Sequence, residues 1–206
     1  MNDMITFKQL EKMDSKTRRD ILKNADIKII AGVIENTKAV CAKMGYYSMP
    51  EVAKLPRIAI ASTRELQLQR FIFESKQLNG IDIVCREFPV GKKSGAGHID
   101  LMGKKGNDIY LYELKYASKD DLTKVICQIA GYYCYMVSNS DDIFPAKSFN
   151  FKPVIVADTV YYEEAQRKNS SNGDYNLASK LLSLLKANGI DINLCEIKYS
   201  TESVSV

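Results

Sequence analysis

The chain has 206 residues, of which 46% are hydrophobic and 26% charged, and its formal net charge is +4. This length and composition are enough for one sizeable hydrophobic core. No apolar run approaches the ~18 residues that span a bilayer, and the first residues lack the basic-then-apolar order of a secretory signal. The five cysteines are scattered without a CxxC pair, so we expect reduced thiols in a cytoplasmic protein with no membrane partner.

Residues 1–60 are predicted to be helical, because apolar residues recur at helical spacing until Pro50 and Pro56 interrupt the pattern. We interpret them as a helical N-terminal segment or small domain. No motif in this part carries recognisable chemistry.

Residues 61–200 are predicted to form the main domain. A helix should begin near Ser62 or Thr63, either of which can cap it, with Glu65 in its first turn. Three strands follow near 81–90, 98–103 and 108–117, and their short connections make them antiparallel. A helix near 120–137 and an amphipathic helix near 175–189 alternate with strands near 152–160 and 190–199, which should add in parallel. Residues 201–206 are predicted to be a disordered tail.

Charged residues occur in the otherwise apolar hairpin of residues 97–117. The connection centres on Gly106-Asn107, which is typical of a two-residue hairpin turn. Pairing about that centre places Asp100 opposite Glu113, so the two carboxylates would lie on one face roughly 4.5–5.5 Å apart. Lys115 follows Glu113 by two residues and shares that face. Taken alone, such a pattern is more typical of a surface ion pair.

Two opposed carboxylates repel each other, and unpaired acids are rarely found on the inner face of a sheet. A divalent cation removes both problems. Mg²⁺ (or Mn²⁺) is commonly held by one or two carboxylates and can activate water for attack on a phosphate. A lysine beside the metal would then stabilise negative charge.

The same residues carry a family resemblance. Asp100, twelve intervening residues and the triplet Glu113-Leu114-Lys115, with a helix before them and the "QIAGYY" helix after, resemble the PD-(D/E)xK nuclease superfamily. Within it, the chain looks most similar to the RecB-type and Holliday-junction-resolvase-like groups. The resemblance covers residues 62–199. It implies an α/β fold with a restriction-endonuclease-like core, α-β-β-β-α-β, and a mixed sheet, here preceded by the helical N-terminal segment. Ile99 stands where the family name has proline.

The resemblance implies a nuclease that hydrolyses phosphodiester bonds, most typically in DNA, with Mg²⁺ or Mn²⁺ as cofactor. The implied metal ligands are Asp100, Glu113, the backbone carbonyl of Leu114, and Glu65, and Lys115 is the implied catalytic lysine. Glu74 is the alternative to Glu65. Gln128 and Tyr132 match the QxxxY motif of the RecB-type group, in which the glutamine positions the lysine or a phosphate and the tyrosine supports it. Glu87 could be a further acid near the site, although a solvated strand residue is the simpler interpretation.

Basic residues in the turns around this site are the candidate nucleic-acid contacts: Lys92, Lys93, His98, Lys104 and Lys105. A solvated turn is the alternative interpretation for all of them. A homodimer would supply the two sites that cutting a duplex requires. A catalytically silent nucleic-acid-binding or interaction protein on the same fold stays open, as do DNA versus RNA and endo versus exo action.

Overall fold

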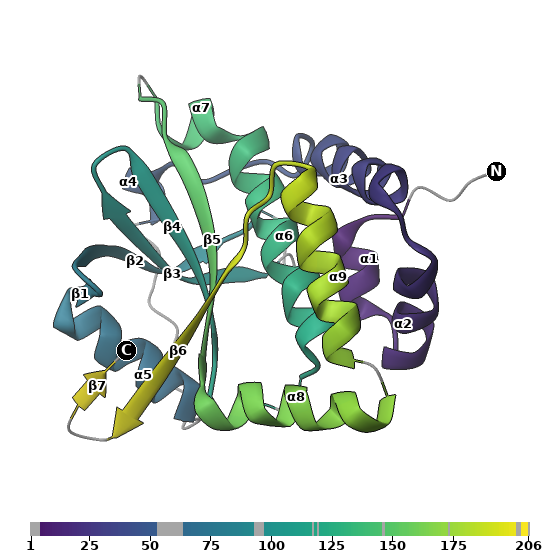
Figure 1. Ribbon diagram of the computed structural model, residues 1–206. Coiled ribbons are helices and arrows are strands. Elements are labelled where there is room, and N and C mark those ends of the chain that lie inside the picture. Colours follow the sequence, from purple (N-terminus) through teal and green to yellow (C-terminus); the bar gives the residue numbers. More distant parts are fainter. Residues whose placement is uncertain are drawn as a thin grey trace.

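The computed structural model of the chain describes residues 5–52, 64–92, 97–116, 118, 120–145, 147–172, 174–200 and 203–205. The fold is α/β, with helices packed on both faces of one sheet (Figure 1). The helices are α1 (Phe7–Lys12), α2 (Ser15–Asn24), α3 (Ile27–Cys41), α4 (Met49–Val52), α5 (Arg64–Ser75), α6 (Leu122–Ser138), α7 (Ser140–Ile143), α8 (Thr159–Asn172) and α9 (Asp174–Ala187). The strands are β1 (Gln77–Leu78), β2 (Ile81–Pro89), β3 (His98–Lys105), β4 (Asp108–Lys115), β5 (Asn150–Asp158), β6 (Asn193–Ser200) and β7 (Ser203–Ser205).

The strands lie side by side in chain order, from β1 to β7. Strands β1 to β4 are antiparallel, whereas β5 pairs in parallel with β4 and β6 with β5. The predicted α/β class with a mixed sheet is therefore confirmed. The predicted disordered tail needs correction, because residues 203–205 pair with β6 as an antiparallel strand. The cap residues predicted for α5, Ser62 and Thr63, lie outside the described residues.

Two apolar clusters cover the two faces of the sheet. The smaller cluster joins α5 to the sheet through Leu68 and Ile72. The larger cluster contains buried side chains of the N-terminal helices, such as Phe7 and Leu10, together with those of α6, such as Ile126. The helices of the described N-terminal residues thus share one core with the sheet. Among the described residues, no helix is both long and apolar enough to cross a membrane.

Arg18 joins α2 to the N-terminus of α6. Its guanidinium is almost fully buried and donates to the carbonyls of Leu10 (3.3 Å) and Met13 (2.7 Å). It also donates to the hydroxyl of Thr123 (3.2 Å) and pairs with Asp121. Asp121 is the N-cap of α6 and accepts from the Lys124 N–H. The buried guanidinium of Arg18 therefore helps to hold α2 against α6. Without Arg18, each of its partners would lose a hydrogen bond.

We expect Arg18→Ala to lower the free energy of unfolding by about 3 kcal/mol, since it leaves Asp121 without its cation and several carbonyls without a donor. Urea denaturation followed by circular dichroism measures this change. Lys16→Ala, on an exposed position of the same helix, is the matched control and should change stability by less than about 0.5 kcal/mol. Equal effects of the two substitutions would contradict this role of Arg18.

Candidate active site

The hairpin of β3 and β4 has the register that the Gly106-Asn107 turn predicts. Lys105 pairs with Asp108, and the ladder continues to Leu101 opposite Tyr112. One position further, Asp100 falls across from Glu113. There the carboxylate Oδ2 of Asp100 accepts a hydrogen bond from the Leu114 N–H at 2.7 Å. The acid at the end of β3 is therefore held directly against the backbone of β4.

Lys115 connects the carboxylates of two different elements. Its Nζ lies 2.7 Å from Oε1 of Glu113 on the same strand, and 3.7 Å from Oε1 of Glu65 on α5. Glu113 is only 1% exposed and Lys115 only 6%. Glu65 also accepts from the Tyr116 N–H at 3.4 Å, which holds the start of α5 beside the end of β4. The predicted acids Asp100, Glu113 and Glu65 thus meet around one buried lysine.

Besides Glu65, helix α5 contributes Gln69 to the site, a residue that the sequence did not single out. Gln69 lies one helical turn after Glu65, is 3% exposed, and donates from Nε2 to the Asp100 carbonyl at 3.0 Å. Its signal in the sequence was the i, i+4 spacing from Glu65, which places both side chains on one face. Glu74, the alternative acid, instead pairs with Arg70 at 2.6 Å on the exposed part of the helix. Glu65 is consequently the α5 acid that faces the site.

Burial raises the pKa of Asp100 to about 7, although Lys115 and the Leu114 N–H partly oppose this, while Glu65 and Glu87 add to it. Glu87 lies on β2. The residue pairs on either side of it in the β2–β3 ladder place it across from Asp100. Its φ of +53° is unusual for a residue with a side chain, so β2 is locally distorted at this position. Glu87 thus adds a further negative charge near Asp100.

Burial and the charge of Asp100 also raise the pKa of Glu113, although Lys115 lowers it. For Lys115, burial favours the neutral amine, but the charges of Glu113, Glu65 and Asp100 outweigh it and raise the lysine pKa. The lysine is therefore charged at neutral pH.

The donor set suits a divalent cation in charge and in ligand type. If all groups ionise, three carboxylates and one ammonium leave two uncompensated negative charges, which a divalent ion would balance. The second oxygen of Glu113, Oε2, is buried and has no hydrogen-bond partner. However, no group of three or more Asp, Glu, His or Cys side chains is already arranged to hold a metal within the described residues. In this structure, the positive charge that lies against the carboxylates is the ammonium of Lys115.

Gln128 and Tyr132 lie one turn apart on α6, and Gln128 Nε2 donates to the Tyr132 hydroxyl at 3.1 Å. The described part of the chain shows no hydrogen bond between Gln128 and Lys115. Tyr132 is buried, and a Cβ placed on Gly97 would come within 2.8 Å of its hydroxyl. Tyr132 therefore packs against the residue that leads into β3, next to the carboxylate cluster.

The predicted basic contacts are dispersed. Lys104 and Lys105 flank the hairpin turn, and Lys104 is four residues along β3 from Asp100, about 13 Å for an extended strand. They therefore lie at the opposite end of the hairpin from the acids. Lys92 is exposed after β2, and His98 is exposed at the start of β3. Lys93 lies outside the described residues.

Comparison of the chain with protein-family models, with curated proteins and with solved structures finds no match.

We expect Asp100→Asn to stabilise the metal-free protein at pH 8 by on the order of 2 kcal/mol. The folded-state pKa of Asp100, about 7, lies above the ordinary value of an unfolded aspartate, so its ionisation destabilises the fold as the pH rises from about 4 to 7. An asparagine keeps an oxygen for the Leu114 N–H without the charge.

Urea denaturation in EDTA at pH 5 and pH 8 measures this difference, which should be larger at pH 8. Asp20→Asn, at an exposed position, is the control and should show no such pH dependence. A variant less stable than the wild-type chain at pH 8 would contradict the assigned electrostatics.

Proposed function

We propose that the protein is a metal-dependent nuclease that hydrolyses phosphodiester bonds in DNA. The observation that carries this proposal is the buried Lys115, paired with Glu113 and Glu65 directly beside Asp100. The elements that hold these residues also support it. Apart from the two-residue strand β1 and the one-turn helix α7, they run α5-β2-β3-β4-α6-β5. This is the α-β-β-β-α-β order of the restriction-endonuclease-like core, to which we assign this domain.

Mg²⁺ or Mn²⁺, when bound, would lower the pKa of a water molecule and neutralise charge on the scissile phosphate. Asp100, Glu113 and Glu65 would hold it, and the carbonyl of Leu114 would add a neutral oxygen. Gln69 fixes the backbone of Asp100, and the Leu114 N–H fixes its side chain. These two contacts keep the carboxylate at the end of β3 aimed towards β4.

Lys115 would act as a cation. Because the surrounding carboxylates keep it charged, it can stabilise the additional negative charge that a phosphate acquires during hydrolysis, and orient the attacking water by donating a hydrogen bond. It is a poor base in this state, since it has no lone pair to accept a proton. Gln128 and Tyr132 line the approach on the α6 side and would contact a phosphate or the water.

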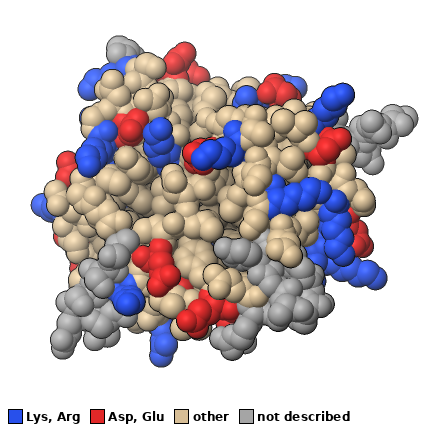
Figure 2. Space-filling view, viewed as in Figure 1, with Lys and Arg blue, Asp and Glu red and all other residues tan. Residues whose placement is uncertain are grey.

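A nucleic acid is the proposed partner because its phosphates require a basic surface, and DNA is chosen because it is the typical substrate of the superfamily that the chain resembles. Lysine and arginine side chains gather on the side of the molecule where α1 and α2 lie (Figure 2). Lys92 and His98 are exposed near the start of β3 and would contact the backbone of the nucleic acid. A homodimer would bring two sites to the two strands of a duplex.

A second candidate is a nucleic-acid-binding protein that lacks catalysis. It is favoured by the absence, among the described residues, of a preformed group of three metal-ligating side chains, and by the tight Lys115–Glu113 pair. Metal binding separates the two candidates, because only the nuclease requires it.

We expect Lys115→Met to reduce cleavage of DNA in Mg²⁺ or Mn²⁺ by on the order of 10²–10³-fold, since it removes the charge that stabilises the transition state but keeps most of the side-chain volume. The assay follows cutting of supercoiled, linear and branched DNA on gels. Lys186→Ala, an exposed lysine on α9, should cut like the wild-type protein. Undiminished cutting by Lys115→Met would remove the lysine from the proposed mechanism.

We also expect Mn²⁺ to raise the melting temperature of the wild-type protein but not that of Asp100→Ala. Binding to the folded state alone stabilises it in proportion to the logarithm of metal concentration. Differential scanning fluorimetry over a Mn²⁺ series measures the shift, with Asp20→Ala as the control. Equal shifts in Asp100→Ala and the control would favour the silent nucleic-acid-binding protein.

A further inference from the structure

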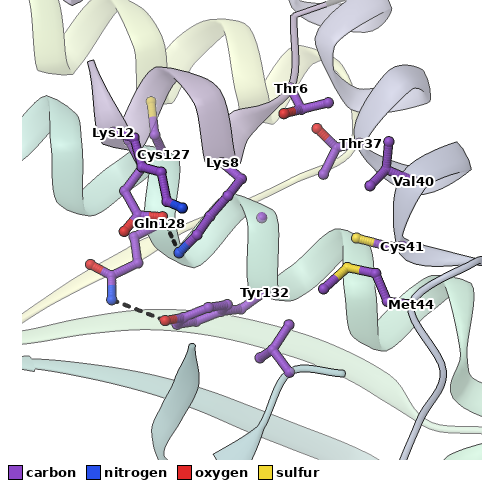
Figure 3. A pocket seen from close by; sticks show the side chains of 13 residues that line it. Thr6, Lys8, Lys12, Thr37, Val40, Cys41, Met44, Cys127, Gln128 and Tyr132 are labelled. Atoms are coloured by element: carbon purple, nitrogen blue, oxygen red, sulfur yellow. Dashed lines mark hydrogen bonds and ion pairs between the residues drawn. The ribbon is translucent and has the colours of Figure 1, made fainter. Parts of the chain in front are cut away.

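A pocket of about 330 Å³ lies between α1, α3 and α6 (Figure 3). Gln128 and Tyr132 of the candidate site form part of its lining. The volume is at the low end of the ~300–1,000 Å³ typical of small-ligand pockets, so it admits one monomer-sized group. The pocket is distinct from the carboxylate cluster, yet it adjoins it.

The two ends of the pocket differ in chemistry. Val40, Cys41 and Met44 lie at one end, and Lys8, Gln128 and Tyr132 at the other (Figure 3). The Thr37 hydroxyl, although it lies in the lining, already accepts from the Phe7 N–H and donates to the Val33 carbonyl. The body of the pocket is therefore apolar. Its polar end contains the Lys8 ammonium, which pairs with the Glu11 carboxylate of the lining at 2.9 Å, together with an amide and a phenol hydroxyl.

Tyr132 connects the pocket with the carboxylate cluster. Burial raises its pKa, and the charges of Glu113, Glu11 and Asp100 raise it further, although the hydrogen bond from Gln128 opposes this. Its hydroxyl lies against Gly97, directly before β3. The Tyr132 ring thus lines the pocket and also contacts the residue from which β3 leads to Asp100.

We propose that this pocket receives one unstacked nucleobase of the substrate strand, and that the substrates are nucleic acids with single-stranded or unpaired nucleotides near the cut. This inference rests on the proposed nuclease function. A nucleobase has apolar faces and a polar edge, as the pocket does. Lys12, which also belongs to the lining, can contact a flanking phosphate, and so can Lys8 if the phosphate replaces its Glu11 partner. A base held within a duplex could not enter, because it would have to leave its stack.

A neighbouring surface supports the same class of substrate. Beyond Met44, the rings of Tyr46 and Tyr47 lie under the ammonium of Lys92, whose Nζ is 5.8 Å and 5.3 Å from the two centroids. Both tyrosines are partly exposed, and the Lys92 ammonium also lies 3.9 Å from the Glu51 carboxylate. Aromatic rings combined with a cation are typical of proteins that stack the bases of single strands. The next nucleotides of a strand that enters the pocket could stack there.

Val40→Trp tests the inference, because Val40 is 51% exposed at the pocket and a larger side chain there can fill the space without entering the core. Ile29→Trp, 46% exposed on the same helix but not in the pocket lining, is the matched control. We expect Val40→Trp to lower kcat/KM for a single-stranded or bulged oligonucleotide by about tenfold, with little change for a fully paired one.

Loss of preference for unpaired substrate in Val40→Trp alone would support the pocket. An unchanged preference, or equal losses in both variants, would overturn it without affecting the proposed nuclease.

A binding experiment tests the pocket independently of cleavage. Oligonucleotides that carry one 2-aminopurine, whose fluorescence rises when the base leaves its stack, are mixed with the Asp100→Asn protein in a background of either Val40 or Val40→Trp. We expect a fluorescence rise that Val40→Trp abolishes and Ile29→Trp retains. If no nucleic acid is cut by the wild-type protein, the nuclease proposal fails and this fluorescence decides the pocket alone. Binding without a fluorescence rise, or no binding at all, would overturn the inference.

Discussion

The ion pair between Lys115 and Glu113 is the interaction around which the site is built. Both side chains are buried, and removing two charges from water costs free energy that a single contact rarely recovers. Here the lysine gains a second carboxylate from Glu65, and Glu65 in turn accepts from the backbone at Tyr116. The packing of α5 against the end of β4 is therefore coupled to the charge state of the site.

The same cluster contains more negative charge than it can neutralise. Asp100 has a pKa near 7 because burial outweighs the help of Lys115, and Glu113 keeps one buried oxygen without a partner. Such an arrangement lowers the stability of the folded chain as the pH rises from about 4 to 7, so a purely structural role gives no reason for it. The proposed role in binding a cation and a phosphate gives such a reason, because the cation would supply the missing positive charge.

The N-terminal helices contribute to the region around this site as well as to the core. Arg18 joins α2 to the cap of α6, so α6 is held at its N-terminus, the end that follows β4 in the chain. Helices α1 and α3 then form the outer wall of the pocket whose inner wall contains Gln128 and Tyr132. The segment that showed no chemistry in its sequence thereby becomes part of the proposed substrate-binding surface, through Lys8 and Val40.

The sequence by itself determined the hairpin and its register, because a two-residue turn and the alternation of a strand are local properties. They were enough to predict Asp100 across from Glu113 and Lys115 on the same face, as the ladder from Lys105–Asp108 to Leu101–Tyr112 bears out. Only the tertiary structure decided between Glu65 and Glu74, since that choice depends on how α5 packs. It also revealed Gln69, the pocket beside Tyr132, and the distance of Lys104 from the acids. These features depend on contacts between elements far apart in the chain, which local periodicity does not specify.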